Sequence, residues 1–118
     1  MDRVAFQPPP VQKPRVPIWV GGGYPIPGPT RRAQRWDGSC LYHAEAHDLK
    51  VEHVRDLRTA AGDRPYDICV GGRERRDGDR EWLAEIAAAG ATWWAEYVPA
   101  QDRSTMRDSV RRGPLRID

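Results

Sequence analysis

The sequence lacks a long hydrophobic run and an excess of charge of one sign, and it has only two cysteines. Because no stretch of about 18 apolar residues occurs, it contains no candidate membrane-spanning helix. Its opening MDRVAFQPPP has no apolar segment typical of a secretory signal. Nineteen Lys and Arg nearly balance seventeen Asp and Glu, so composition does not favour a nucleic-acid partner. Cys40 and Cys69 lie in apolar stretches, which is typical of buried, reduced thiols. Together these features predict a cytoplasmic protein, and its 118 residues make one domain at most.

Familiar catalytic and metal-binding patterns are also missing. The chain has neither the GK[ST] of a Walker loop nor a GxGxxG fingerprint. His43, His47 and His53 have no cysteine or carboxylate at ligand spacing, so no metal site is predicted. The charged segment at 73–80, RERRDGDR, is predicted to be a solvated loop because its acids largely cancel its bases.

Apolar runs and helical patterns alternate along the chain. Residues 1–15 hold PPP and Pro14 and are predicted to form an extended arm, followed by one domain over 16–118. The expected elements are strands at 16–20, 39–42, 66–70 and within 91–98, and helices at about 30–36, 48–61, 80–89 and 103–112. This order predicts an α/β fold with a parallel sheet. It would be either an open four-stranded sheet or half of a TIM (β/α)8 barrel, since a complete barrel needs about 200 residues.

The segment PIWVGGGYP at 17–25 suggests a binding site. A strand that stops before Gly21, Gly22 and Gly23 would leave backbone N–H groups free of side chains. A helix beginning just afterwards, with Arg31 and Arg32 in its first turn, would add donors for a phosphate. The alternative is that the glycines only turn the chain.

Three segments carry a resemblance to a known family. They are PPPVQKPRVPIWVGGG, RRAQRWDG and AAAGATWWAE, and they resemble the C-terminal part of the bacterial luciferase-like monooxygenases. That family includes flavin-dependent monooxygenases and oxidoreductases that use coenzyme F-420. The resemblance spans about residues 6–113 and implies the last four strands of a TIM barrel, an FMN or F-420 coenzyme and a small organic substrate. It also implies that backbone amides of Gly21 and Gly22, and in part Gly23, hold the flavin phosphate.

The resemblance does not extend to the first half of the barrel, which in the family supplies much of the flavin and substrate pockets. No catalytic side chain is therefore nominated, and the chain alone is expected to be inactive. Two functions stay open: an oxidoreductase chain that contributes the phosphate loop, or a non-catalytic half-barrel that self-associates.

The two outer strands of such a half-barrel, 16–20 and Thr92–Tyr97, contain no lysine to guard their edges. We therefore expect a homodimer or a complex with a missing N-terminal half. Trp93 and Trp94 are predicted to face opposite sides of their strand. The side chains predicted to face the barrel interior include some of Ile18, Val20, Leu41, Ile68, Val70 and the Trp93–Trp94 pair.

Overall fold

Four strands alternate with four helices in the computed structural model, which describes residue 8 and residues 11–117. The elements are β1 (Trp19–Tyr24), α1 (Pro27–Ala33), β2 (Gly38–His43), α2 (Val51–Ala61), β3 (Asp67–Arg73), α3 (Asp79–Ala88), β4 (Trp93–Glu96) and α4 (Arg103–Arg112). The predicted alternation is confirmed.

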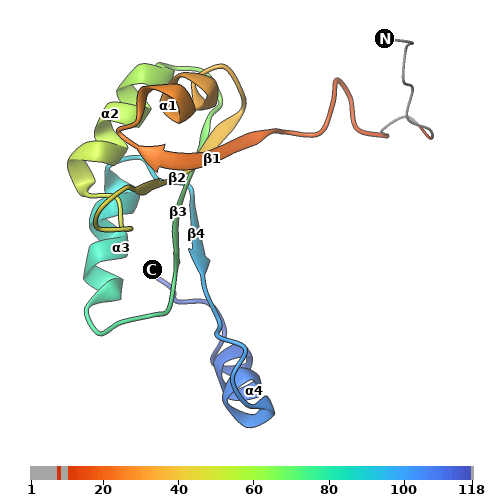
Figure 1. The fold of residues 1–118 in the computed structure, drawn as a ribbon, viewed down its shortest axis with the longest axis vertical. Helices are drawn as coiled ribbons and strands as arrows, with labels where there is room; N and C mark the ends of the chain where they lie inside the picture. The colour runs from red at the N-terminus through yellow and green to blue at the C-terminus, as the bar shows by residue number, and fades with distance from the viewer. Residues whose placement is uncertain (1–7, 9–10, 118) are drawn as a thin grey trace.

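The strands form one parallel sheet in the order β1-β2-β3-β4. The helices α1, α2 and α3 lie on the same side of it, while α4 lies beyond the carboxyl end of β4 (Figure 1). In a doubly wound sheet the strand order reverses and helices cover both faces. Here the order is sequential and the helices are on one side, which is consistent with half of a β/α barrel.

The core lies between the sheet and these three helices. On α2, Val54, Leu57 and Ala61 are buried, and their spacing forms one helical stripe. The strands and the other helices complete the core with Ala33, Leu41, Ile68, Val70 and Ile86.

Some of Ile18, Val20, Leu41, Ile68, Val70 and the Trp93–Trp94 pair were predicted to face a barrel interior. Of these, Leu41, Ile68 and Val70 lie instead in the core beside the helices, whereas Trp93 is exposed. Neighbouring residues on a strand point to opposite faces, and the row with the large branched side chains is the one that the helices bury.

The first strand and first helix differ from the prediction. β1 begins at Trp19 and continues through all three glycines, pairing Gly21 with Cys40 and Gly23 with Tyr42. Of the predicted arm, residues 1–7 and 9–10 lie outside the described residues, and residues 11–18 form no helix or strand. The arm is joined to the domain by Arg15, whose guanidinium donates a hydrogen bond of 3.1 Å to Asp37.

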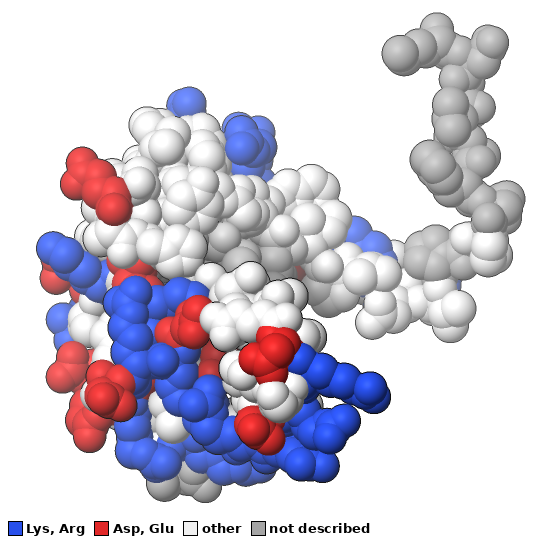
Figure 2. Space-filling model, turned by 60° about the horizontal axis from the view of Figure 1, so that its bottom comes forward, with Lys and Arg blue, Asp and Glu red and all other residues white. Residues whose placement is uncertain are grey.

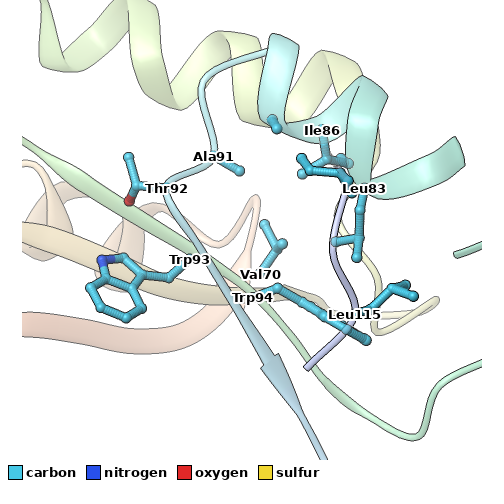
Figure 3. A pocket seen from close by; sticks show the side chains of 10 residues that line it. Val70, Leu83, Ile86, Ala91, Thr92, Trp93, Trp94 and Leu115 are labelled. Atoms are coloured by element: carbon cyan, nitrogen blue, oxygen red, sulfur yellow. The ribbon is translucent and has the colours of Figure 1, made fainter. Parts of the chain in front are cut away.

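The C-terminal segment packs unevenly. Asp102 caps α4 by accepting hydrogen bonds from the amides of Ser104 and Thr105, yet no residue of α4 is buried. The tail that follows returns to the domain, where Leu115 lines a cavity of about 130 Å³ with Leu83 and Trp94 (Figure 3). None of the described helices is both long and apolar enough to cross a membrane.

Candidate functional site

The face of the sheet opposite the helices has no covering element among the described residues. We call it the open face, and it consists of Trp19, Gly21, Cys40, Tyr42, Cys69, Trp93 and Ala95. These residues alternate with the core residues of the same strands. Trp19, Tyr42 and Trp93 are 37%, 45% and 56% exposed. Trp94, by contrast, packs against the core, so the prediction that Trp93 and Trp94 face opposite sides is confirmed.

Two tryptophans from the outer strands meet across this face. The ring centroids of Trp19 on β1 and Trp93 on β4 are 5.7 Å apart, with the planes tilted by 51°. A side chain at Gly38, on β2 between them, would lie 2.7 Å from the Trp19 ring. The glycine therefore leaves room for the indole. The pair closes the part of the open face nearest the amino ends of the strands.

Beyond the Trp19–Trp93 pair, the open face carries small side chains. Gly21, Cys40 and Ala95 are exposed, whereas Cys69, the register partner of Trp93, is 5% exposed. Burial, with a smaller contribution from the neighbouring Cys40, raises the pKa of the Cys69 thiol to about 12. The exposed small residues Gly21, Cys40 and Ala95 form an apolar platform beside the aromatic rings.

The three glycines of β1 have different surroundings. A Cβ at Gly22 would lie 2.7 Å from Pro29 of α1, and one at Gly23 would lie 2.8 Å from Ile26. At Gly21 the nearest atom would be the Cys40 carbonyl oxygen, at an ordinary 3.6 Å. Packing against Pro29 and Ile26 therefore requires glycine at positions 22 and 23. A side chain would fit at position 21, so packing does not require the space that Gly21 leaves on the open face.

The start of α1 offers few donors for an anion. Ile26 is the N-cap residue, and Pro27 and Pro29 in the first turn have no N–H. The Thr30 amide is already bonded to the Ile26 carbonyl. The first turn thus leaves the Gly28 amide as its free donor among the described contacts.

The placement of Arg31 and Arg32 in the first turn of this helix is wrong. The helix begins at Pro27, because proline is well suited to a first helical position, so both arginines fall in its last turn. There they lie near the negative end of the helix dipole and away from the carboxyl ends of the strands. The structure therefore does not bring them together with Gly21, Gly22 and Gly23 around one point.

A cluster of rings lies at the carboxyl ends of β1 and β2. The His53 ring of α2 is 5.0 Å from Tyr24 and 5.1 Å from His43, and the two imidazoles are stacked. Nδ1 of His43 accepts from the Ala46 amide, and Nδ1 of His53 accepts from the Lys50 amide. The described residues contain no group of three or more His, Cys, Asp or Glu side chains able to hold a metal ion.

Next to this cluster, His47 is the one described non-glycine residue with a positive φ, 64°. Its ring stacks on Tyr42 of the open face at 5.8 Å. The sequence gives no signal for this stacking, because it depends on a tight turn that joins the backbones of His43 and His47.

The segment at 73–80 was predicted to be a solvated loop. In the structure, several of its side chains instead form ion pairs with the rest of the domain. Arg73 donates to both Asp48 and Asp79, and Arg75 donates to Glu96, with N–O distances of 2.6–2.8 Å for the shortest contact of each pair. The hydrogen bond from Arg73 lowers the pKa of the buried Asp79 carboxyl. These pairs connect the end of β3 to α3, to β4 and to the segment before α2.

A cavity of about 590 Å³ opens beside these ion pairs. Its lining comprises His47, Gly72, Arg73, Glu74, Arg75, Arg76 and Tyr97. Although it is rich in arginine, Arg73 and Arg75 are held by carboxylates of the same chain. Basic and acidic side chains are intermingled over the face shown in Figure 2. The cavity is therefore not a strongly positive site for an anion.

Comparison of this chain with protein-family models, with curated proteins and with solved structures gave no match.

Proposed function

We propose that this chain is one half of a flavin-type β/α barrel, of the luciferase-like kind, and that its open face helps to hold an FMN or F-420 coenzyme. The sequential parallel sheet with helices on one side supports the barrel. The segments PRVPIWVGGG, RRAQRWDG and AGATWW support the family. The reaction would be the oxidation of a small organic substrate, with the coenzyme supplying the redox chemistry.

The observation that carries this proposal is the platform of small residues on the open face. Gly21, Cys40 and Ala95 leave an exposed apolar area beside the Trp19–Trp93 pair and Tyr42. A planar ring system would fit there, because aromatic rings gain from offset or edge-on contact with indole and phenol rings. The chain's own part is to position the ring and exclude water from one of its faces.

The phosphate contact is proposed at the free edge of β1. In a parallel sheet, alternate residues of a strand direct their N–H groups toward a given neighbour. Because β1 has a neighbouring strand, β2, on one side only, the N–H groups of its other residues point to the unpaired edge. The amides of β1 that point away from β2 are therefore available as donors beside Gly21. Arg31 and Arg32 have no part in this proposal, because they lie at the other end of α1.

Coenzyme titration tests the proposal with two glycine variants. Gly21→Val would place a branched side chain on the platform, where the backbone tolerates a Cβ. Gly28→Ala is the matched control, because its Cβ would also meet only an ordinary contact, 3.6 Å from Arg32, but in the helix layer. We expect FMN or F-420 to bind the natural chain and Gly28→Ala equally, and Gly21→Val about tenfold more weakly. The absence of binding by either coenzyme, or equal binding by all three proteins, would contradict the proposal.

A non-catalytic half-barrel that self-associates is the second candidate. The exposure of Trp93 on an open sheet face favours it. Absorbance of the freshly purified protein distinguishes the two candidate functions, since a bound flavin absorbs at about 450 nm and a deazaflavin at about 420 nm. A colourless protein that takes up neither coenzyme would favour the second candidate.

A further inference from the structure

Both outer strands of the sheet have a free edge. β1 and β4 each pair with one neighbour among the described strands. The β1 segment WVGGGY contains no charged residue and no proline. Proteins usually protect such an edge with lysine, proline or a covering element, because its unpaired N–H and C=O groups attract other strands. The β1 edge has none of these within its six residues.

The β4 edge is chemically similar. Its one charged residue, Glu96, already accepts hydrogen bonds from Arg75 at 2.6 Å and from Arg112 at 3.1 Å. The edge therefore brings no unpaired charge to a neighbour. α4 lies beyond the end of β4 and buries none of its own residues, and β3 is the one strand that pairs with β4 among the described residues (Figure 1).

We infer that a second copy of this chain covers the open face, arranged so that β1 of each copy lies beside β4 of the other. A two-fold axis along the strand direction keeps every strand parallel and joins both pairs of edges at once. Neither edge presents an unpaired charge, since β1 has no charged residue and Glu96 of β4 is already paired with Arg75 and Arg112, so the two edges are compatible in one interface. The product is a closed ring of eight strands with no free edge.

The side chains of the open face suit the interior of that ring. Barrel interiors are filled by layers of four side chains. The Trp19–Trp93 pair of each copy would meet its equivalent at the axis, so that four indoles form one layer near the amino ends of the strands. The exposed small residues Gly21, Cys40 and Ala95 would leave part of the interior open. This inference does not depend on a coenzyme, and it is tested without one. Pairing β1 with β4 of the other copy would occupy the β1 amides that point away from β2, so the dimer and the phosphate contact proposed at that edge exclude each other.

Molar mass in solution tests the inference. Size-exclusion chromatography with light scattering at micromolar concentration should give about twice the 13.4 kDa of one chain. Trp93→Lys and Tyr42→Lys place a charge on the open face at positions that are exposed in one copy, so each single chain should still fold. Trp36→Lys is the matched control, because Trp36 is 38% exposed but lies outside the open face.

We expect each open-face variant to weaken the dimer by about tenfold or more, and Trp36→Lys to leave it unchanged. Circular dichroism establishes that each variant remains folded. A folded natural chain that stays monomeric would overturn the inference. A dimer unaffected by both open-face variants, or a ladder of larger species, would overturn it as well, because it would show another surface or edges that do not close.

Discussion

Arg73 is the clearest place to perturb this fold. Its guanidinium is 10% exposed and donates to Asp79 at 2.7 Å and to Asp48 at 2.8 Å, and it lies 5.1 Å from the Trp82 ring. Asp79 is itself only 5% exposed. Arg73→Met keeps much of the side-chain length but leaves a buried carboxylate without its partner.

The expected cost follows from that burial. Removing one partner of a buried ion pair typically destabilises a protein by about 3–5 kcal/mol. A domain of this size is stable by about 5–15 kcal/mol, so the variant should lose a large part of its free energy of unfolding. Arg76→Met is the control: Arg76 shares Asp48 at 3.4 Å but is 65% exposed, and an exposed pair is worth about 0–1 kcal/mol.

Urea unfolding, followed by tryptophan fluorescence at one fixed protein concentration, measures both variants. The sign of the pH effect gives a second test. In the natural chain Arg73 lowers the pKa of Asp79 below its ordinary 3.8, so this stabilisation is present above about pH 4 and is lost as the pH falls through the lowered pKa. In Arg73→Met, Asp79 stays buried but loses the guanidinium, so its pKa should rise above that in the natural chain and acidification should reduce the penalty of the variant. An Arg73→Met midpoint equal to that of Arg76→Met at pH 7 would refute the reasoning.

Three further predictions concern chemistry and pH. The isolated chain, with reduced flavin and oxygen, should show no measurable monooxygenase turnover; turnover proportional to protein concentration would contradict this. A thiol reagent at mildly alkaline pH should label the exposed Cys40 rapidly and Cys69 slowly, because burial raises the pKa of Cys69 to about 12; equal rates for both thiols would contradict the burial. Burial, with a smaller effect of the neighbouring His43, lowers the pKa of His53 below its ordinary 6.5, so the unfolded chain binds more protons there and stability should fall as the pH drops below about 6.5. His53→Gln should weaken that pH dependence, and an unchanged profile would count against it.

The order of the elements could be predicted from the sequence, because the strands contain apolar runs and the helices α2 and α3 have apolar stripes. The β1 boundary could not. Three glycines normally end a strand, yet here Pro29 lies over Gly22 so closely that no side chain would fit. The start of α1 was missed for a related reason, since Pro-Gly-Pro is as typical of a turn as of a first helical turn.

The site was harder to predict than the fold. The balance of charges at 73–80 indicated a solvated loop, but it reflects pairing: Arg73 meets Asp48, 25 residues earlier in the chain. That Trp93 and Trp94 face opposite sides of the sheet could be predicted from the alternation of side chains along a strand. The meeting of Trp93 with Trp19 depends on the twist of the whole sheet, and no local pattern encodes it.

The sequential order β1-β2-β3-β4 also has a consequence for how the chain folds. Every strand finds its partner in the next strand along the chain, so no pairing waits for a distant segment. Loop-closure entropy rises with the length of chain between partners, and proteins with mostly local contacts fold faster. The sheet can therefore grow one strand–helix unit at a time from any adjacent pair. Each added unit leaves its new outer strand with an unpaired edge, as the unit before it did. The number of strands in the finished sheet therefore depends on what pairs with the last strand, β4.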